Sequence, residues 1–108
     1  MNFTKRRLGQ YTILVSNKHK LTEWWVGNKR HRIGKPAVKG VGYEQWWKEG
    51  KLHREDGPAV IYKNGLKEWY FEGEFIYSNM ERVVMNFKSL QTRLPEKLVL
   101  SIAMDKNS

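Results

Sequence analysis

Hydrophobic and polar residues alternate along the first three quarters of the chain, and clusters of turn residues interrupt the alternation at short intervals. Alternation with a period of two residues predicts β-strands that are buried on one side. Consecutive strands that are joined by short turns pair as hairpins. We therefore expect three hairpins, with strands at 11–16 and 21–26, at 36–38 and 43–47, and at 60–63 and 66–69.

The third hairpin carries the strongest turn signal, Asn64-Gly65. Both residue types tolerate a positive φ, so they predict a two-residue loop with a type I′ turn. A loop of this length also sets the pairing register, so that Val60 faces Trp69.

The same residue types return at a separation of 22 positions. Trp24 recurs as Trp46 and His31 as His53, and the arginine after each histidine keeps the same separation. A third, less regular copy places Trp69 23 positions after Trp46. A period in the low twenties predicts an array of small units, none of which buries its apolar face alone.

Each copy contains two adjacent aromatic residues, and adjacent residues of a strand face opposite sides of a sheet. The aromatic residues therefore form two columns. We expect the column with the more apolar neighbours to face the core and the other to be partly exposed. The first column is Trp24, Trp46 and Trp69, and the second is Trp25, Trp47 and Tyr70.

After residue 77 the apolar positions recur every three to four residues, which predicts amphipathic helix. Ser78 and Glu81 have the spacing of a capping box, and the pattern then runs from Met80 to Leu94. Pro95 interrupts the pattern and suits the first turn of a second short helix. The inward residues of that second helix are expected to be Leu98, Val99, Ile102 and Met104.

Together these patterns predict an α+β fold: an antiparallel meander of three repeated β-hairpins, followed by a C-terminal helix or two short helices that pack on the sheet. A chain of 108 residues forms one domain of ordinary size. We expect 1–9 to be a basic, mobile lead-in, 10–77 to hold the hairpin repeats, and 78–105 to form the helical segment.

Positive charge is concentrated in the first half of the chain. Residues 1–54 contain 13 lysines and arginines and three acids, which gives a net charge of +10. Residues 55–108 contain seven lysines and arginines and eight acids, which gives a net charge of −1. This asymmetry favours a basic binding surface over the first two repeats. The alternative is the general surface of a basic soluble protein.

Cations that alternate with aromatic rings are typical of single-stranded nucleic-acid binders and of protein interface hot spots. The alternative for tryptophans at a repeat period is a place in the core. The candidate macromolecule-binding residues are Lys5, Arg6, Arg7, Trp25, Lys29, Arg30, Arg32, Trp47, Lys51 and Arg54.

His31 and His53 are equivalent by repeat, and each precedes an arginine. They form either a basic ladder for phosphates or, the interpretation that we favour, a repeated pair that satisfies the loop backbone while the arginine stacks on a tryptophan. Two histidines without cysteine or a close carboxylate make a poor ligand set, so we expect no metal site. The sequence also contains no nucleophile–base motif and no phosphate-binding loop, so we expect neither an enzyme nor a cofactor.

The run H-R-E-D-G-P-A at 53–59, then Asn64-Gly65 and the W-Y-F-E-G run at 69–73, resembles a MORN-variant repeat. This form of the motif is similar to small repeat proteins of bacteriophages and other large DNA viruses. The resemblance covers residues 21–77 at most, and the first copy departs from it because Ile33-Gly34-Lys35 replaces Glu-Asp-Gly. It implies an antiparallel array of hairpins that serves as a binding scaffold without catalytic residues.

The leading hypothesis is a non-catalytic phage or viral protein that docks on a host macromolecule with an acidic surface, either a host protein or a protein–nucleic acid complex, and modulates it. The second is an RNA- or single-stranded-DNA-binding protein that uses tryptophan stacking and phosphate contacts. The third is a self-associating module, because an uncovered strand at 11–16 would pair with the same strand of a second copy of the chain. We expect no membrane partner, and the absence of cysteine fits the cytoplasm of a host.

Overall fold

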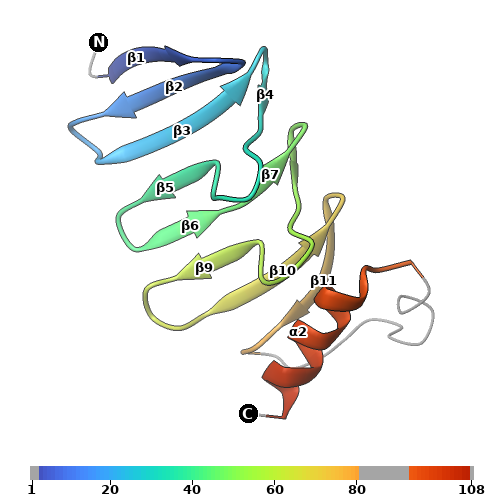
Figure 1. Ribbon diagram of the computed structural model, residues 1–108. Helices are drawn as coiled ribbons and strands as arrows, with labels where there is room; N and C mark the ends of the chain where they lie inside the picture. Colours follow the sequence, from blue (N-terminus) through green and yellow to red (C-terminus); the bar gives the residue numbers. More distant parts are fainter. Residues whose placement is uncertain (1–2, 81–92, 108) are drawn as a thin grey trace.

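The computed structural model describes residues 3–80 and 93–107. These residues form an elongated antiparallel β-sheet with one helix against its C-terminal end (Figure 1), within an envelope of 46 × 28 × 16 Å. The described elements are β1 (Phe3–Leu8), β2 (Tyr11–Ser16), β3 (Leu21–Val26), β4 (Lys29–Arg30), β5 (Val38–Gly40), β6 (Tyr43–Gln45), β7 (Trp47–Lys48), β8 (Lys51–Leu52), β9 (Val60–Tyr62), β10 (Lys67–Phe71), β11 (Glu74–Ser78) and α2 (Glu96–Lys106).

The strands follow one another across the sheet almost in chain order, as in a meander. The order is β1-β2-β3-β5-β6-β9-β10-β11, with β4 beside β3, while β7 and β8 form a separate two-stranded ribbon. All described pairs are antiparallel. The predicted meander of hairpins followed by a C-terminal helix is therefore confirmed, with a composition that is mostly β.

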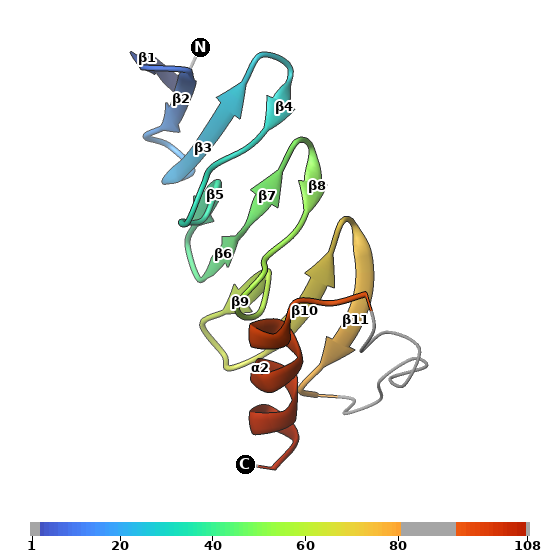
Figure 2. The same ribbon diagram turned by 45° about the vertical axis from the view of Figure 1, so that its right-hand side comes forward.

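The repeat of the sequence is also a repeat of the backbone. The N–H of Trp24 donates to the carbonyl of Ala37 at 2.7 Å, and the N–H of Trp46 donates to the carbonyl of Ala59 at the same distance. Beyond each tryptophan the chain turns back in a tight hairpin, and Figure 2 shows these hairpins as successive loops along one side of the array. A unit of this size is too small to bury its own apolar residues, so each unit packs on the next.

The sequence predicted a mobile lead-in over residues 1–9, but Phe3–Leu8 forms strand β1. This strand pairs with β2 along its whole length, from Phe3 opposite Ser16 to Leu8 opposite Tyr11. The expected free strand at 11–16 is therefore covered on both sides. The basic residues that suggested a mobile segment are of the kind that natural proteins place on edge strands.

The first two predicted hairpins are confirmed as β2–β3 and β5–β6, although the strands of the second lie at 38–40 and 43–45 rather than at 36–38 and 43–47. The register of the third hairpin is wrong by one residue. Val60 pairs with Glu68 and not with Trp69. The loop has three residues, 63–65, and of these only Gly65 has a positive φ, +97°. A three-residue loop that ends in such a glycine is a common alternative to the two-residue turn.

The main hydrophobic core lies between the last hairpin and α2. It consists of Trp69, Ile76, Tyr77, Leu94, Leu98 and Ile102. Two polar contacts anchor the helix: the indole Nε1 of Trp69 donates to Ser101 Oγ at 3.0 Å, and the hydroxyl of Tyr77 donates to Asp105 Oδ2 at 2.8 Å.

The helix after Pro95 is confirmed, with Leu98 and Ile102 fully buried and Val99 packed against the core. The expected inward position of Met104 is wrong, because its side chain is 73% exposed. Ser78 ends β11 and does not begin a helix. The predicted helix over 80–94 lies mostly outside the described residues.

The tryptophan column that was expected to face the core is buried only at one end. Trp69 is 2% exposed, whereas Trp24 and Trp46 are half-buried, because α2 packs on the last unit. Trp25, Trp47 and Tyr70 are partly exposed as predicted. No helix in the described ranges 3–80 and 93–107 has the length and apolar character that crossing a membrane requires.

Candidate binding surface

The two repeated histidines connect each unit to the next. His31 Nδ1 accepts a hydrogen bond from the N–H of Glu49 at 3.0 Å, and His53 Nδ1 accepts one from the N–H of Glu72 at 2.9 Å. Both glutamates stand at the following hairpin turn with a positive φ, 49° and 50°. The favoured interpretation, in which the histidines satisfy backbone groups, is confirmed.

The arginine that follows each histidine lies over a tryptophan of its own unit. The guanidinium carbon of Arg32 is 3.6 Å from the ring centroid of Trp24, and that of Arg54 is 4.0 Å from Trp46. Each also donates Nη1 to a backbone carbonyl, of Pro36 at 3.2 Å and of Pro58 at 3.1 Å. These contacts hold both arginine side chains against the sheet, in agreement with the predicted stacking of arginine on tryptophan.

Burial lowers the pKa of Arg32 below its ordinary value, and the nearby Tyr11 acts in the opposite direction. Arginine stays protonated at every pH of interest, so the cation on Trp24 is permanent.

Arg30 fills the space between the two tryptophans that were expected to be stacking platforms. Its guanidinium carbon lies 5.0 Å from the ring centroid of Trp25 and 5.2 Å from that of Trp47. Its Nη2 forms an ion pair with Glu23 at 2.9 Å. The facing sides of these two rings are therefore already in contact with a side chain of the protein itself.

The register divides the predicted binding residues between the two faces of the sheet, because paired residues share a face. Arg6 pairs with Ile13, which pairs with Trp24. Arg7 is aligned through Thr12 with Trp25 on the opposite face.

Lys29 and Lys51 lie at the tips of successive hairpins, each against the glycine of the next turn. The side chain of Lys29 is within 3.9 Å of the space that a Cβ on Gly50 would fill, and Lys51 stands in the same relation to Gly73. Both glycines have a positive φ, +82° and +83°. Lys48 joins these two lysines around a groove of about 400 Å³, whose lining also includes Glu49 and Glu72. We call Lys29, Lys48 and Lys51 the tip cluster.

Lys5, Arg6 and Arg7 occupy the middle of β1, where every residue is exposed. We call these three residues the β1 cluster. None of the six cations of the two clusters forms an ion pair with another described residue. Lys48 was absent from the sequence-based candidates, although its place two residues after Trp46 would have identified it as a tip residue.

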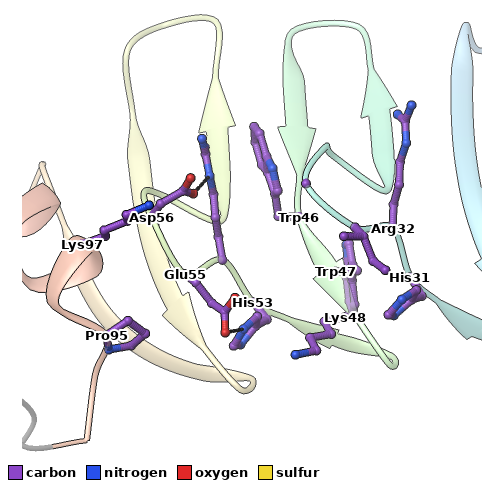
Figure 3. A pocket seen from close by; sticks show the side chains of 13 residues that line it. His31, Arg32, Trp46, Trp47, Lys48, His53, Glu55, Asp56, Pro95 and Lys97 are labelled. Atoms are coloured by element: carbon purple, nitrogen blue, oxygen red, sulfur yellow. Dashed lines mark hydrogen bonds and ion pairs between the residues drawn. The ribbon is translucent and has the colours of Figure 1, made fainter.

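A larger groove of about 640 Å³ opens between the loop after β8 and the first turn of α2 (Figure 3). Asp56 and Lys97 face each other across its helical side, and Trp46, Trp47 and His31 line the other. One ion pair joins two of the charged side chains that line the groove. Arg54 Nε bonds to Asp56 at 3.0 Å, and His53 Nε2 is 3.7 Å from Glu55 Oε1.

His53 is 7% exposed, and burial lowers its pKa below the ordinary value; the nearby carboxylate of Glu55 opposes this shift. Its ring is therefore neutral near pH 7, with Nδ1 as the acceptor and the proton on Nε2. Within 3–80 and 93–107, no three histidine, aspartate or glutamate side chains gather as a metal ion would require. The sequence did not predict this groove, because it forms between a repeat loop and a helix far along the chain.

No family model, curated protein or solved structure matches this chain. The resemblance to MORN-variant repeats therefore stays a prediction from the motif residues.

Proposed function

We propose that this chain is a non-catalytic binding protein that docks on an acidic macromolecule through the β1 cluster and the tip cluster. The observation that carries the proposal is that nine lysines and arginines of residues 3–54 are exposed and form no ion pair with another described residue. They are Lys5, Arg6, Arg7, Lys18, Lys20, Lys29, Lys35, Lys48 and Lys51.

Of the three acids in residues 1–54, two are paired with cations outside this set, and the third, Glu49, contributes one negative charge beside the tip cluster. Glu23 is held by Arg30 at 2.9 Å, and Glu44 lies 3.9 Å from Lys39. Unbalanced charge of one sign raises the local concentration of partners of the opposite sign and speeds their association. An acidic surface is therefore the partner that the charge distribution favours.

The β1 cluster and the tip cluster are the two groups that we assign to the docking surface. Both project from strands or tight turns, which hold charged side chains at fixed spacings. The remaining candidates, Arg30, Arg32 and Arg54, support this surface by packing on the tryptophans. The viral origin and the host-cytoplasmic partner extend the proposal on the strength of the sequence motif alone.

Two defined probes test the proposal: labelled poly-L-glutamate and a mixed-sequence single-stranded oligonucleotide, each titrated with the full chain over a salt series. The variants K5Q/R6Q/R7Q and K29Q/K48Q/K51Q remove the two clusters. The variant K18Q/K20Q/K35Q is the matched control, since it removes the same charge from exposed positions outside the clusters. Both cluster variants should weaken polyglutamate binding more than the control does.

Absence of polyglutamate binding at low salt, or equal weakening by all three variants, would contradict the proposal. The nucleic-acid alternative predicts tighter binding of the oligonucleotide, with affinity that falls steeply as salt rises. It also predicts that an abasic oligonucleotide of equal length binds more weakly, because base stacking on tryptophan would be lost.

A further inference from the structure

Strand β1 leaves the outer edge of the sheet open. It stands first in the strand order, and β2 is its only strand partner within 3–80 and 93–107. In Figure 1 no element lies beyond it. In an antiparallel ladder every second residue of such a strand directs its N–H and C=O groups outward, where another strand can pair with them.

The edge is long and regular enough to accept a strand. All six residues of β1 pair with β2 in one unbroken register, without a bulge or a proline. Bulges, prolines and short length are the usual means by which proteins prevent pairing at an edge. Of the features that prevent pairing at an edge, β1 has only charged side chains.

That charge disfavours a second copy of the chain as the occupant. In an antiparallel pair of two β1 strands centred on Arg6, Lys5 of one copy would face Arg7 of the other. Like charges directly opposite each other destabilise strand pairing. The same three cations favour an acidic strand, whose carboxylates would face cations on both sides of the sheet.

The ends of the strand add apolar contacts. Phe3 is 45% exposed and Leu8 is 59% exposed, one at each end of the β1 cluster. A pairing segment with acidic residues in the middle and apolar residues at its ends would match this order of side chains.

We propose that β1 binds an extended acidic segment of a partner protein as an added antiparallel strand at the edge of the sheet. Strand addition of this kind takes its affinity from main-chain hydrogen bonds and its specificity from the alternate side chains. The inference rests on the proposed function and names the partner: a polypeptide segment with an acidic centre. The tip cluster has no part in it.

The test uses a labelled peptide of sequence T-V-E-D-E-V-T and two N-methylated forms of it, with methyl groups on the odd or on the even amides. An antiparallel strand uses only one of these two sets towards β1. One methylated form should therefore bind at least about tenfold more weakly than the parent peptide, and the other should bind like the parent. Hydrogen exchange of the full chain should slow at the β1 amides when the parent peptide is added.

The variant K5Q/R6Q/R7Q should weaken peptide binding about tenfold, with K18Q/K20Q/K35Q as the control of equal charge. Circular dichroism verifies that each variant is folded. Equal binding of both methylated forms and the parent, without protection of the β1 amides, would overturn strand addition. Binding of polyglutamate that still depends on the clusters would, in that case, leave the proposed function intact.

Two other occupants give different results. Sedimentation over a range of protein concentrations detects a second copy, and a dimer that protects the β1 amides without peptide would overturn the proposal. Protection of the same amides by the oligonucleotide but not by the peptide would also overturn it, in favour of a nucleic acid.

Discussion

The two ends of the array differ in burial and in charge. At the N-terminal end every residue of β1 is exposed, and the first 54 residues of the chain have a net charge of +10. At the C-terminal end Ile76 and Tyr77 are fully buried beneath α2, and the second half of the chain has a net charge of −1. One end is closed by a helix and the other is open.

The repeated histidine position shows how an array is closed. His31 and His53 each accept a hydrogen bond from the turn of the next unit. In the last unit Ile76 stands in this position, seven residues after Trp69 as His53 stands seven residues after Trp46. Among the described residues after Ser78 no further hairpin supplies a donor, and the apolar Ile76 packs against the helix instead.

The equivalent residues Trp24 and Trp69 have similar ring contacts but differ in whether a helix packs over them. Trp24 meets Tyr11 edge-on at 5.1 Å between ring centroids, and Trp69 meets Tyr77 at the same distance. Only Trp69 also lies under α2, where its indole N–H reaches Ser101. The open end therefore keeps similar contacts between rings but buries less surface, which leaves it free to bind a partner.

The largest expected effect is a loss of unfolding free energy, which should differ between the substitutions of Trp69 and Trp24. Replacing Trp69 with alanine removes a ring that is 98% buried and a hydrogen bond to α2, and should lower the free energy of unfolding by about 3–5 kcal/mol. Trp24→Ala, at the half-buried equivalent position, should cost less than about 2 kcal/mol. Urea denaturation followed by circular dichroism measures both. Equal losses would show that the helix does not distinguish the two ends.

The next largest effect on the free energy of unfolding should come from the hydrogen bond by which His53 joins two successive units. His53→Ala removes the acceptor for the N–H of Glu72 and leaves that group without a partner, at a cost of about 1–3 kcal/mol. His53→Asn places a side-chain oxygen near the position of Nδ1 and should recover part of the loss. The unfolding free energies of the two variants check this, and an Asn variant no better than the Ala variant would argue against the hydrogen bond.

Acidification should also weaken this contact. Burial lowers the pKa of His53 in the folded protein, so the unfolded chain binds the proton more readily. Stability is therefore complete above the ordinary histidine pKa of 6.5 and declines as pH falls from there towards the lowered value of the folded state. Protonation removes the Nδ1 acceptor as well. Urea midpoints from pH 7.5 to about 5 should show this decline, and His53→Asn should reduce it; an unchanged slope would assign the decline to other groups.

The smallest expected effect on stability lies at the open end. K5Q/R6Q/R7Q changes three exposed side chains and should alter the free energy of unfolding by less than about 0.5 kcal/mol, although it weakens binding of the acidic peptide. A large loss of stability would mean that the β1 cluster holds the sheet together, and would remove the contrast between the two ends.

Local signals in the sequence determined much of the fold. The 22-residue period, the strands at 11–16 and 21–26, and the helix after Pro95 follow from alternation, turn residues and helical periodicity, which act over a few residues. The same is true of the stacked pairs of arginine and tryptophan and of the role of the histidines, since the repeat itself required a contact between units.

Tertiary contacts decided the rest. The basic segment at 3–8 became a strand because β2 offered it a complete pairing register, and Arg30 lies between Trp25 and Trp47 because two successive units place the rings on either side of it. Which tryptophan of the column is buried depends on where α2 packs. Burial and the open edge of the sheet are properties of residues far apart in sequence, so only the assembled array could fix them.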